Sequence, residues 1–348
     1  MSAKETAGWY GSTLEALVAR RDLDATHACQ VVHGILLGEL GDVELGALLI
    51  AWRMKGETGE ELAAAAAVLR EHMVGVEPGR PDVLDTCGTG GDGLQTFNIS
   101  TATAIVVAAA GVAVVKHGNR AVSSQSGSAD VLTHLGVSLE LDPAGVRRCL
   151  DRVGLAFCLA PQFHPALKSV GLVRKRLGVR TIFNCLGPLA NPAGAGYQLL
   201  GVGRQEWLDP MAQALARLRT RHAYLVHGSD GLDEVTLTGP TQVREVRGNQ
   251  VWHHVWMPSD FGLEPVELDQ LTVNGPLGSA AVIRDILDGR DGPPRRIVLA
   301  NAAAALLAAD VQPGLTEGVR AARRAIDSGA ARELLQKWSE SSRLGKEG

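Results

Sequence analysis

The sequence predicts an α/β protein in which a small helical N-terminal domain precedes a large α/β domain with a mainly parallel central sheet. Its 348 residues are enough for two domains. Apolar residues recur at helical spacing over residues 12–73. Beyond residue 77, short apolar runs alternate with helical patterns, an order typical of a parallel sheet with helices on both faces.

The first region is predicted to be helical throughout. Leu14, Leu17 and Val18 begin a pattern with a spacing of three to four residues. Glycine-containing segments at 41–42 and 56–59 separate successive helices. Each helix presents an apolar face, so we expect the helices to pack together as one module.

The second region is predicted to begin with a strand at residues 82–86, a helix at 99–110 and a strand at 112–115. A helix at 128–135 and a short strand at 138–141 follow. Further along we expect strands at 199–202 and 223–227 and a helix at 297–309. The charged tail after Leu335 is expected to fray.

Bulk properties exclude several classes of protein. A net charge of −4 argues against a nucleic-acid partner, whose binding proteins are usually basic. The longest uninterrupted apolar run, residues 104–115, is too short to cross a membrane, and no signal-peptide core is apparent. The five cysteines are scattered without zinc-type spacing, as in a reducing compartment. We therefore expect a cytoplasmic protein without membrane contact.

The segment at 85–98, DTCGTGGDGLQTFN, is the most informative motif. Four glycines stand between a predicted strand and a predicted helix, where free backbone N–H groups can bind phosphate. Three of them also match G-x-G-x-x-G, but a dinucleotide site needs an acidic residue about 20 residues further on. Lys116 and His117 stand at the end of the next predicted strand instead, and no Gly-Lys-Ser/Thr follows the loop. The motif predicts a phosphate or pyrophosphate site.

Polar residues follow this loop and the next predicted strand. Thr96, Asn98, Ser100 and Thr101 lie at a helix start, where capping and contact with a phosphate or metal are both open interpretations. The segment at 116–120, KHGNR, follows the strand, so the Lys116 ammonium can neutralise a phosphate. The later serines at 126–128 begin a further helix, which capping alone also explains.

Two more features indicate charged ligands. Asp233 and Glu234 follow a predicted strand and offer oxygen ligands to Mg²⁺, although such a pair alone is also typical of a solvated loop. Arg174 shares a helix face with apolar residues, so its guanidinium either faces a cleft and binds a carboxylate or forms a structural ion pair. Lys175, Arg176 and Arg180 are expected to form a solvated face.

Taken together, these motifs resemble those of the anthranilate phosphoribosyltransferases over nearly the whole chain. The matching stretches are GTGGD at 88–92, NIST at 98–101, KHGNR at 116–120, SGSAD at 126–130, VRTIFN and LGPLANP within 179–192, and HGSDGLDE at 227–234. The resemblance implies transfer of a phosphoribosyl group from phosphoribosyl pyrophosphate (PRPP) to the amine of anthranilate, in tryptophan biosynthesis. No strong base is needed for this reaction, because an aromatic amine is already nucleophilic.

The resemblance also implies the architecture. It predicts a large α/β domain like that of the pyrimidine nucleoside phosphorylases, over residues 77–348. The small domain would comprise residues 1–76, joined by helices from about 164–189. Two copies would form a homodimer through their helical domains.

Site residues are implied by matching positions. Those for PRPP are Gly88, Thr89, Gly90, Gly91, Asp92, Thr96, Asn98, Ser100, Thr101, Lys116 and Ser128. Those for Mg²⁺ are Ser100, Asp233 and Glu234. Those for anthranilate are Gly88, His117, Asn119, His164, Arg174 and Gly187. Arg174 and His117 are the expected catalytic residues, with Arg174 on or near the anthranilate carboxylate and His117 as the best candidate for a base.

Gln125, Leu167 and the segment 273–287 depart from the usual family pattern. We expect the segment 273–287 to lie away from the motifs.

Two alternative functions can be compared with this expectation. A nucleoside phosphorylase would share the fold, but the KHGN motif and Arg174 favour an acid-bearing amine as acceptor. A non-catalytic relative that binds nucleic acid is opposed by the Asp233–Glu234 pair and the acidic balance.

Overall fold

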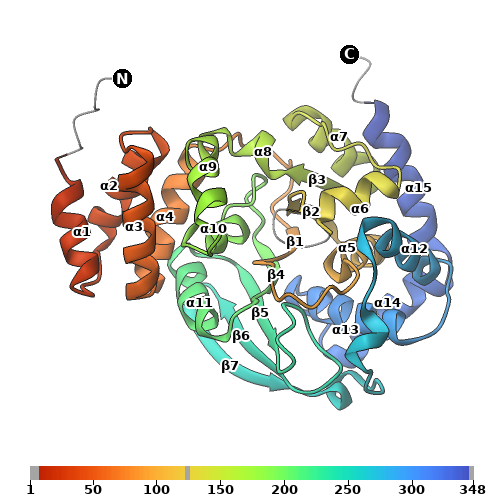
Figure 1. Ribbon diagram of the computed structural model, residues 1–348. Helices are drawn as coiled ribbons and strands as arrows, with labels where there is room; N and C mark the ends of the chain where they lie inside the picture. The colour runs from red at the N-terminus through yellow and green to blue at the C-terminus, as the bar shows by residue number, and fades with distance from the viewer. Residues whose placement is uncertain (1–7, 122–125, 345–348) are drawn as a thin grey trace.

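The structure is a computed structural model that describes residues 8–121 and 126–344. A helical module lies beside an α/β unit (Figure 1). The module begins with four helices, which confirms the helical prediction for this region: α1 (Tyr10–Val18), α2 (Ala25–Leu36), α3 (Asp42–Lys55) and α4 (Gly59–Glu71). Side chains cap two of them. Asp24 accepts a hydrogen bond from the His27 N–H of α2, and Thr58 forms a capping box with Glu61 at the start of α4.

Seven strands form one sheet in the order β3-β2-β1-β4-β5-β6-β7. Their bounds are β1 (Val83–Gly88), β2 (Ala113–Gly118), β3 (Leu155–Leu159), β4 (Tyr197–Gly201), β5 (His222–Gly228), β6 (Thr241–Arg247) and β7 (Gln250–Trp256). The first five strands in this order pair in parallel, and β6 and β7 add an antiparallel hairpin. The mainly parallel sheet is confirmed, whereas the hairpin was not predicted.

Helices cover both faces of the sheet (Figure 1). The remaining helices are α5 (Ile99–Ala109), α6 (Ser128–His134), α7 (Pro143–Val153), α8 (Ala160–Phe163), α9 (Lys168–Leu177), α10 (Phe183–Leu189), α11 (Leu208–Arg217), α12 (Gly275–Leu287), α13 (Pro293–Ala308), α14 (Leu315–Asp327) and α15 (Ala330–Arg343). One face packs against α5 and α13, which pack in turn on α14 and α15. On the other face, α10 contacts β2, and α11 contacts β5, β6 and β7. No helix within the described ranges is long and apolar enough to cross a membrane.

Two sequence predictions are wrong. No strand forms at residues 138–141; the edge of β2 pairs with β3 instead, and the Ser138 N–H donates to Ser342 Oγ on α15. β3 is buried along its whole length and so competes better for that edge. The tail does not fray after Leu335, because α15 continues to Arg343 and buries Trp338 completely.

The helical module and the sheet share a continuous apolar core. Val170 and Val173 of α9 and Phe183 of α10 belong to the same buried cluster as the side chains of α2, α3 and α4. That cluster continues through α11 to Leu200 of β4 and Leu225 of β5. Mid-chain helices are thus packed on the N-terminal helices, and the N-terminal helices are held against the sheet.

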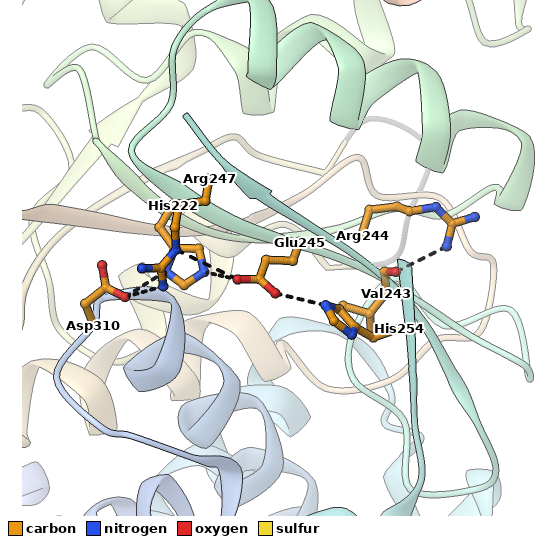
Figure 2. A network of polar contacts seen from close by, with 7 residues as sticks. All are labelled: His222, Val243, Arg244, Glu245, Arg247, His254 and Asp310. Atoms are coloured by element: carbon orange, nitrogen blue, oxygen red, sulfur yellow. Dashed lines mark hydrogen bonds and ion pairs between the residues drawn. The ribbon is translucent and has the colours of Figure 1, made fainter. Parts of the chain in front are cut away.

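Polar contacts around the buried His222 ring anchor the antiparallel hairpin (Figure 2). His222, the first residue of β5, lies with its ring nitrogens 3.2 Å from Glu245 Oε1 on β6 and 2.9 Å from Asp310 Oδ1 after α13. His254 of β7 reaches the other Glu245 oxygen at 2.9 Å, and Arg247 of β6 donates to Asp310 at 2.8 Å. These contacts lie at the amino end of β5, away from the carboxyl ends where the predicted motifs begin.

The burial of α15 predicts a large stability effect. Trp338→Ala should lower the free energy of unfolding by about 3–5 kcal/mol, because it leaves a cavity against α5 and α7. Trp252→Ala is the matched control, since this tryptophan on β7 is 39% exposed. Urea denaturation followed by circular dichroism measures both. Equal effects of the two substitutions would mean that α15 does not belong to the core.

Candidate active site

Most of the predicted site residues meet in one cavity of about 360 Å³ at the carboxyl ends of β1 and β2. The loop after β5 closes one side of it. The predicted residues that line it are Gly88, Thr89, Gly90, Gly91, Asp92, Thr96, Asn98, Ser100, Lys116, His117, Asn119, Ser128, Arg174, Asp233 and Glu234. Thr101, His164 and Gly187 do not line it. Parallel strands bring their carboxyl ends to one edge, which is why motifs far apart in sequence converge here.

The glycine loop packs closely against Asp233 in the loop after β5. Gly90, Gly91 and Gly93 have φ of +67°, +71° and +78°, the left-handed region that favours glycine. The Gly90 N–H donates to Asp233 Oδ2 at 2.8 Å. A Cβ on Gly88 would lie 2.6 Å from the same carboxylate oxygen. The glycines therefore let the half-buried Asp233 carboxylate lie directly against the backbone.

The surroundings of Asp233 and Glu234 oppose the ionisation of both carboxyl groups as long as no cation is bound. Burial, followed by repulsion from Asp92 and Glu234, raises the pKa of Asp233 well above its usual range. Burial also raises the pKa of Glu234, while the Lys116 ammonium and hydrogen bonds from Ser100 oppose that shift. Such a pair favours a bound cation.

The donor set fits Mg²⁺. Two carboxylates with the Ser100 hydroxyl are hard oxygen ligands, and Mg²⁺ takes one or two carboxylates and completes its shell with water and substrate phosphates. Among the described residues no three His, Cys, Asp or Glu side chains converge on one point, so an all-protein cage is not formed there. The arrangement suits a metal that is shared with a phosphate ligand.

Lys116 and His117 lie inside β2, not after it, which corrects the predicted end of that strand. Consecutive residues of a strand point to opposite faces of the sheet. The buried Lys116 ammonium donates to the Thr86 carbonyl and, at 3.1 Å, to Ser100 Oγ at the start of α5. The His117 ring lies on the α10 side, 3.1 Å from the Gly187 carbonyl oxygen. The side chains of Lys116 and His117 therefore lie on opposite faces of the sheet.

His117 is neutral at physiological pH. Burial, the nearby His164 and the Lys116 charge lower its pKa to about 3, with the Gly187 carbonyl opposing the shift. Because a carbonyl oxygen only accepts hydrogen bonds, Nδ1 carries the ring proton and Nε2 carries the lone pair. Nε2 is buried without a hydrogen-bond partner among the described residues. His164 lies with its ring centroid 5.0 Å away, and burial lowers its pKa to about 4.

A second cavity of about 500 Å³ adjoins the first and shares Asn119, Arg174, Arg180 and Asn184 with it. His164 lines this cavity, as does Leu167, one of the atypical positions. Arg174 projects from α9, and its Cζ lies 5.6 Å from the centroid of the Phe183 ring. Its guanidinium pairs with no carboxylate within the described ranges, so the structural ion pair considered from the sequence is not observed there. Burial lowers its pKa.

Sequence reasoning missed several residues of the site. Lys175 and Arg176 are exposed as predicted, but Arg180 lines both cavities and is not part of a solvated face. Helical spacing misplaced it, because α9 ends at Leu177 and Arg180 lies in the turn that follows. Asn184, in the VRTIFN motif, also lines both cavities.

The prediction that segment 273–287 lies away from the motifs is wrong. Val273 and Gly275 line the first cavity. Ser279 Oγ accepts from the Asn98 N–H at 2.9 Å and donates to Asn98 Oδ1 at 3.0 Å. The segment thus packs directly on the residue before α5. Gln125 lies outside the described residues.

Comparisons with known proteins agree with this architecture. The profile of the glycosyl transferase family helical bundle domain matches residues 12–73, and that of the glycosyl transferase family a/b domain matches residues 80–332. The chain is 50% identical over 323 residues to the anthranilate phosphoribosyltransferase of Thioalkalivibrio sulfidiphilus, covering 93% of this chain and 96% of the relative.

Solved structures of the same kind superpose closely. The crystal structure of anthranilate phosphoribosyltransferase from Thermus thermophilus gives a TM-score of 0.88 at 42% identity, over 95% of this chain and 99% of that one. The enzyme from Saccharomyces cerevisiae in complex with PRPP and Mg gives 0.88 at 30% identity, over 97% and 99%. The same yeast enzyme in complex with 4-fluoroanthranilate gives 0.87 at 29% identity, over 96% and 98%.

Proposed function

The chain belongs to the anthranilate phosphoribosyltransferase family, and from this premise we propose how its residues divide the work of the reaction. The enzyme transfers the phosphoribosyl group of PRPP to the amine of anthranilate, with Mg²⁺ as cofactor, and yields N-phosphoribosylanthranilate and pyrophosphate. The observation that carries the assignment of residues is the contact between two cavities. One is lined by a glycine loop and two half-buried acids, the other by a guanidinium that pairs with no carboxylate among the described residues.

The donor occupies the first cavity in this proposal. The glycine loop, Gly88 to Asp92, and the polar residues around the start of α5 hold its phosphates, together with Lys116 and Ser128. Thr101 acts from behind this surface, since its side chain is fully buried and lines neither cavity. Ser100, Asp233 and Glu234 hold Mg²⁺. When bound, the ion supplies positive charge that stabilises the departing pyrophosphate.

Anthranilate enters through the second cavity. Arg174 binds its carboxylate through the planar guanidinium, and Asn119 and His164 line the path. Gly88 and Gly187 complete the acceptor site, with Gly187 acting through its carbonyl on His117. Holding the amine against the anomeric carbon supplies the positioning on which the rate depends.

His117 completes the reaction. The amine lone pair forms the bond to the anomeric carbon, and the electrons of the broken carbon–oxygen bond leave with pyrophosphate. The nitrogen must then lose one proton, and His117 Nε2 offers a buried lone pair to accept it. A pKa of about 3 makes His117 a weak base. A weak base suffices, because a protonated aromatic amine is far more acidic than a protonated alkyl amine.

The proposal extends to organisation and location. The small domain comprises residues 1–76 with about 164–189, supported by the packing of α9 and α10 on the N-terminal helices. Residues 77–348 form the large domain. A cytoplasmic location is supported by the five cysteines, all of which are free thiols.

A homodimer is supported by an apolar groove on α1 and α3. Val18, Val43 and Met54 line it and are 70%, 80% and 70% exposed. Large apolar side chains gathered on one face are typical of an interface. We assign this face to a second copy of the chain, joined through the helical domains.

The role of Arg174 predicts a selective kinetic defect. Arg174→Ala should raise the KM for anthranilate by about tenfold or more, because a charge-assisted hydrogen bond to the carboxylate is lost. The KM for PRPP should change less than about twofold. Steady-state assays that follow anthranilate fluorescence measure both constants. Arg176→Ala, on the exposed side of the same helix, is the control, and an equal rise in both KM values would remove the proposed role.

The metal assignment predicts a linked loss. Asp233→Asn combined with Glu234→Gln should weaken Mg²⁺ dependence and activity together, because the carboxylate ligands are removed. Activity titrated with Mg²⁺ at saturating PRPP measures this. Glu206→Gln, an exposed acid elsewhere on the surface, should leave the titration unchanged. An unaltered titration in the double variant would mean that the pair is only part of a loop.

The dimer assignment predicts a change in mass. The wild-type chain should sediment as two copies and Val43→Asp as one, because a charge is placed in the apolar groove. Val255→Asp is the control, since Val255 on β7 is 51% exposed and remote from this groove. A dimeric Val43→Asp variant or a monomeric wild type contradicts the assignment.

A further inference from the structure

Arg180 occupies the junction between the two cavities. It follows α9, precedes α10 and lines both cavities, although spacing placed it on a solvated face. Its backbone is held by the helical module, because Arg53 of α3 donates a hydrogen bond to the Arg180 carbonyl. The residue therefore extends from the helical module to the edge of the sheet.

The Arg180 guanidinium lies between the glycine loop and an indole ring. Its Nη2 occupies the position that a Cβ on Gly91 would take, so a side chain at residue 91 would displace the guanidinium from the loop, and the positive φ of Gly91 itself favours glycine. On the other side, Arg180 Cζ lies 5.8 Å from the centroid of the Trp207 ring. Cation–π contact of this kind holds a guanidinium in place without using its N–H groups.

Those N–H groups donate no hydrogen bond to the described residues. Arg180 Nη1 is buried without a hydrogen-bond partner, and the guanidinium forms no ion pair with a carboxylate, among residues 8–121 and 126–344. Burial and the charge of Arg204 lower the pKa of Arg180, while Asp233 and Asp92 act in the opposite direction. A half-buried guanidinium with one N–H group buried and unpaired is unfavourable by itself, which points to an anionic ligand as its partner.

We propose that Arg180 binds the pyrophosphate group of PRPP at the glycine loop and stabilises the negative charge that develops as this group leaves. The inference rests on the proposed function and assigns a further residue to it. Contact with Gly91 places the guanidinium on the phosphate side of the junction. Arg174, whose guanidinium sits over the Phe183 ring, serves the carboxylate of the acceptor.

The Arg180 guanidinium and a pyrophosphate group are complementary in charge and in hydrogen bonding. Pyrophosphate carries several negative charges on closely spaced oxygens, and a guanidinium fork donates two parallel hydrogen bonds to such a group. Negative charge on the leaving oxygen increases as the bond to the anomeric carbon breaks, so a donor fixed at this point favours the transition state. Loss of the fork should therefore affect kcat as well as the binding of PRPP.

Two measurements test the proposal. In the first, calorimetry measures the affinity of inorganic pyrophosphate with Mg²⁺ for the full chain. Arg180→Gln should weaken this affinity at least tenfold, and Arg180→Lys should recover part of it, since charge is kept and the fork is lost. In the second, steady-state kinetics should show a higher KM for PRPP and a lower kcat in Arg180→Gln, with the KM for anthranilate nearly unchanged.

Arg204→Gln is the matched control. Its guanidinium stacks on the same Trp207 ring, with Cζ 5.5 Å from the centroid, but lines neither cavity. It should leave both the pyrophosphate affinity and the KM for PRPP unchanged. Thermal unfolding of all three variants identifies any loss of folded protein.

The outcomes separate the possibilities. Unchanged pyrophosphate affinity in Arg180→Gln, a rise only in the KM for anthranilate, or an equal defect in Arg204→Gln would each overturn the proposal. If the wild type shows no turnover, the proposed function fails, while the calorimetric comparison with pyrophosphate still decides whether Arg180 binds this anion.

Discussion

Buried charge at the carboxyl ends of β1 and β2 is the constraint on which the rest of the site depends. Lys116 holds the β1 backbone and Ser100 from one face of the sheet. Asp85, buried beside it, accepts from the His117 N–H at 3.1 Å and from Asn191 Nδ2 at 2.8 Å. These groups are out of water, so each must keep its partner, and the strand ends are held in a single arrangement.

In the proposed assignment, the pleat of β2 then separates the residues for the two substrates. Lys116 points toward α5 and the proposed phosphate-binding residues. His117 points toward α10 and the proposed acceptor site. Adjacent residues of one strand can do this only because successive side chains alternate between faces. The donor residues therefore come mainly from the sheet. The acceptor side, with Arg174 and His164, is built largely by the mid-chain helices that pack on the N-terminal module.

Electrostatic balance joins these two sides. The acid pair of the loop after β5 is hard to ionise without a cation, and Arg174 and Arg180 carry positive charge without carboxylate partners within the described ranges. In the proposed assignment, Mg²⁺ stabilises the ionised acid pair, while a phosphorylated donor and an acidic acceptor pair with the two guanidinium groups. Stability is provided elsewhere, by the apolar cores and by contacts such as the hairpin network around His222. The site is thereby left free to hold charges that only its ligands complete.

Local chemistry was readable from the sequence: the glycine loop, the helical module, the acid pair and the mainly parallel sheet follow from residue type and short-range spacing. Tertiary packing decided the rest. The edge of β2 pairs with β3 and not with residues 138–141. The burial of Trp338 accompanies the extension of α15 to Arg343, and the hydrogen bond to Ser279 places segment 273–287 against Asn98. Arg180 escaped prediction because its place is set by a turn after α9 and by contacts with Gly91 and Trp207. Spacing along one helix predicts which residues share a face, but a long-range contact depends on which elements fold against each other.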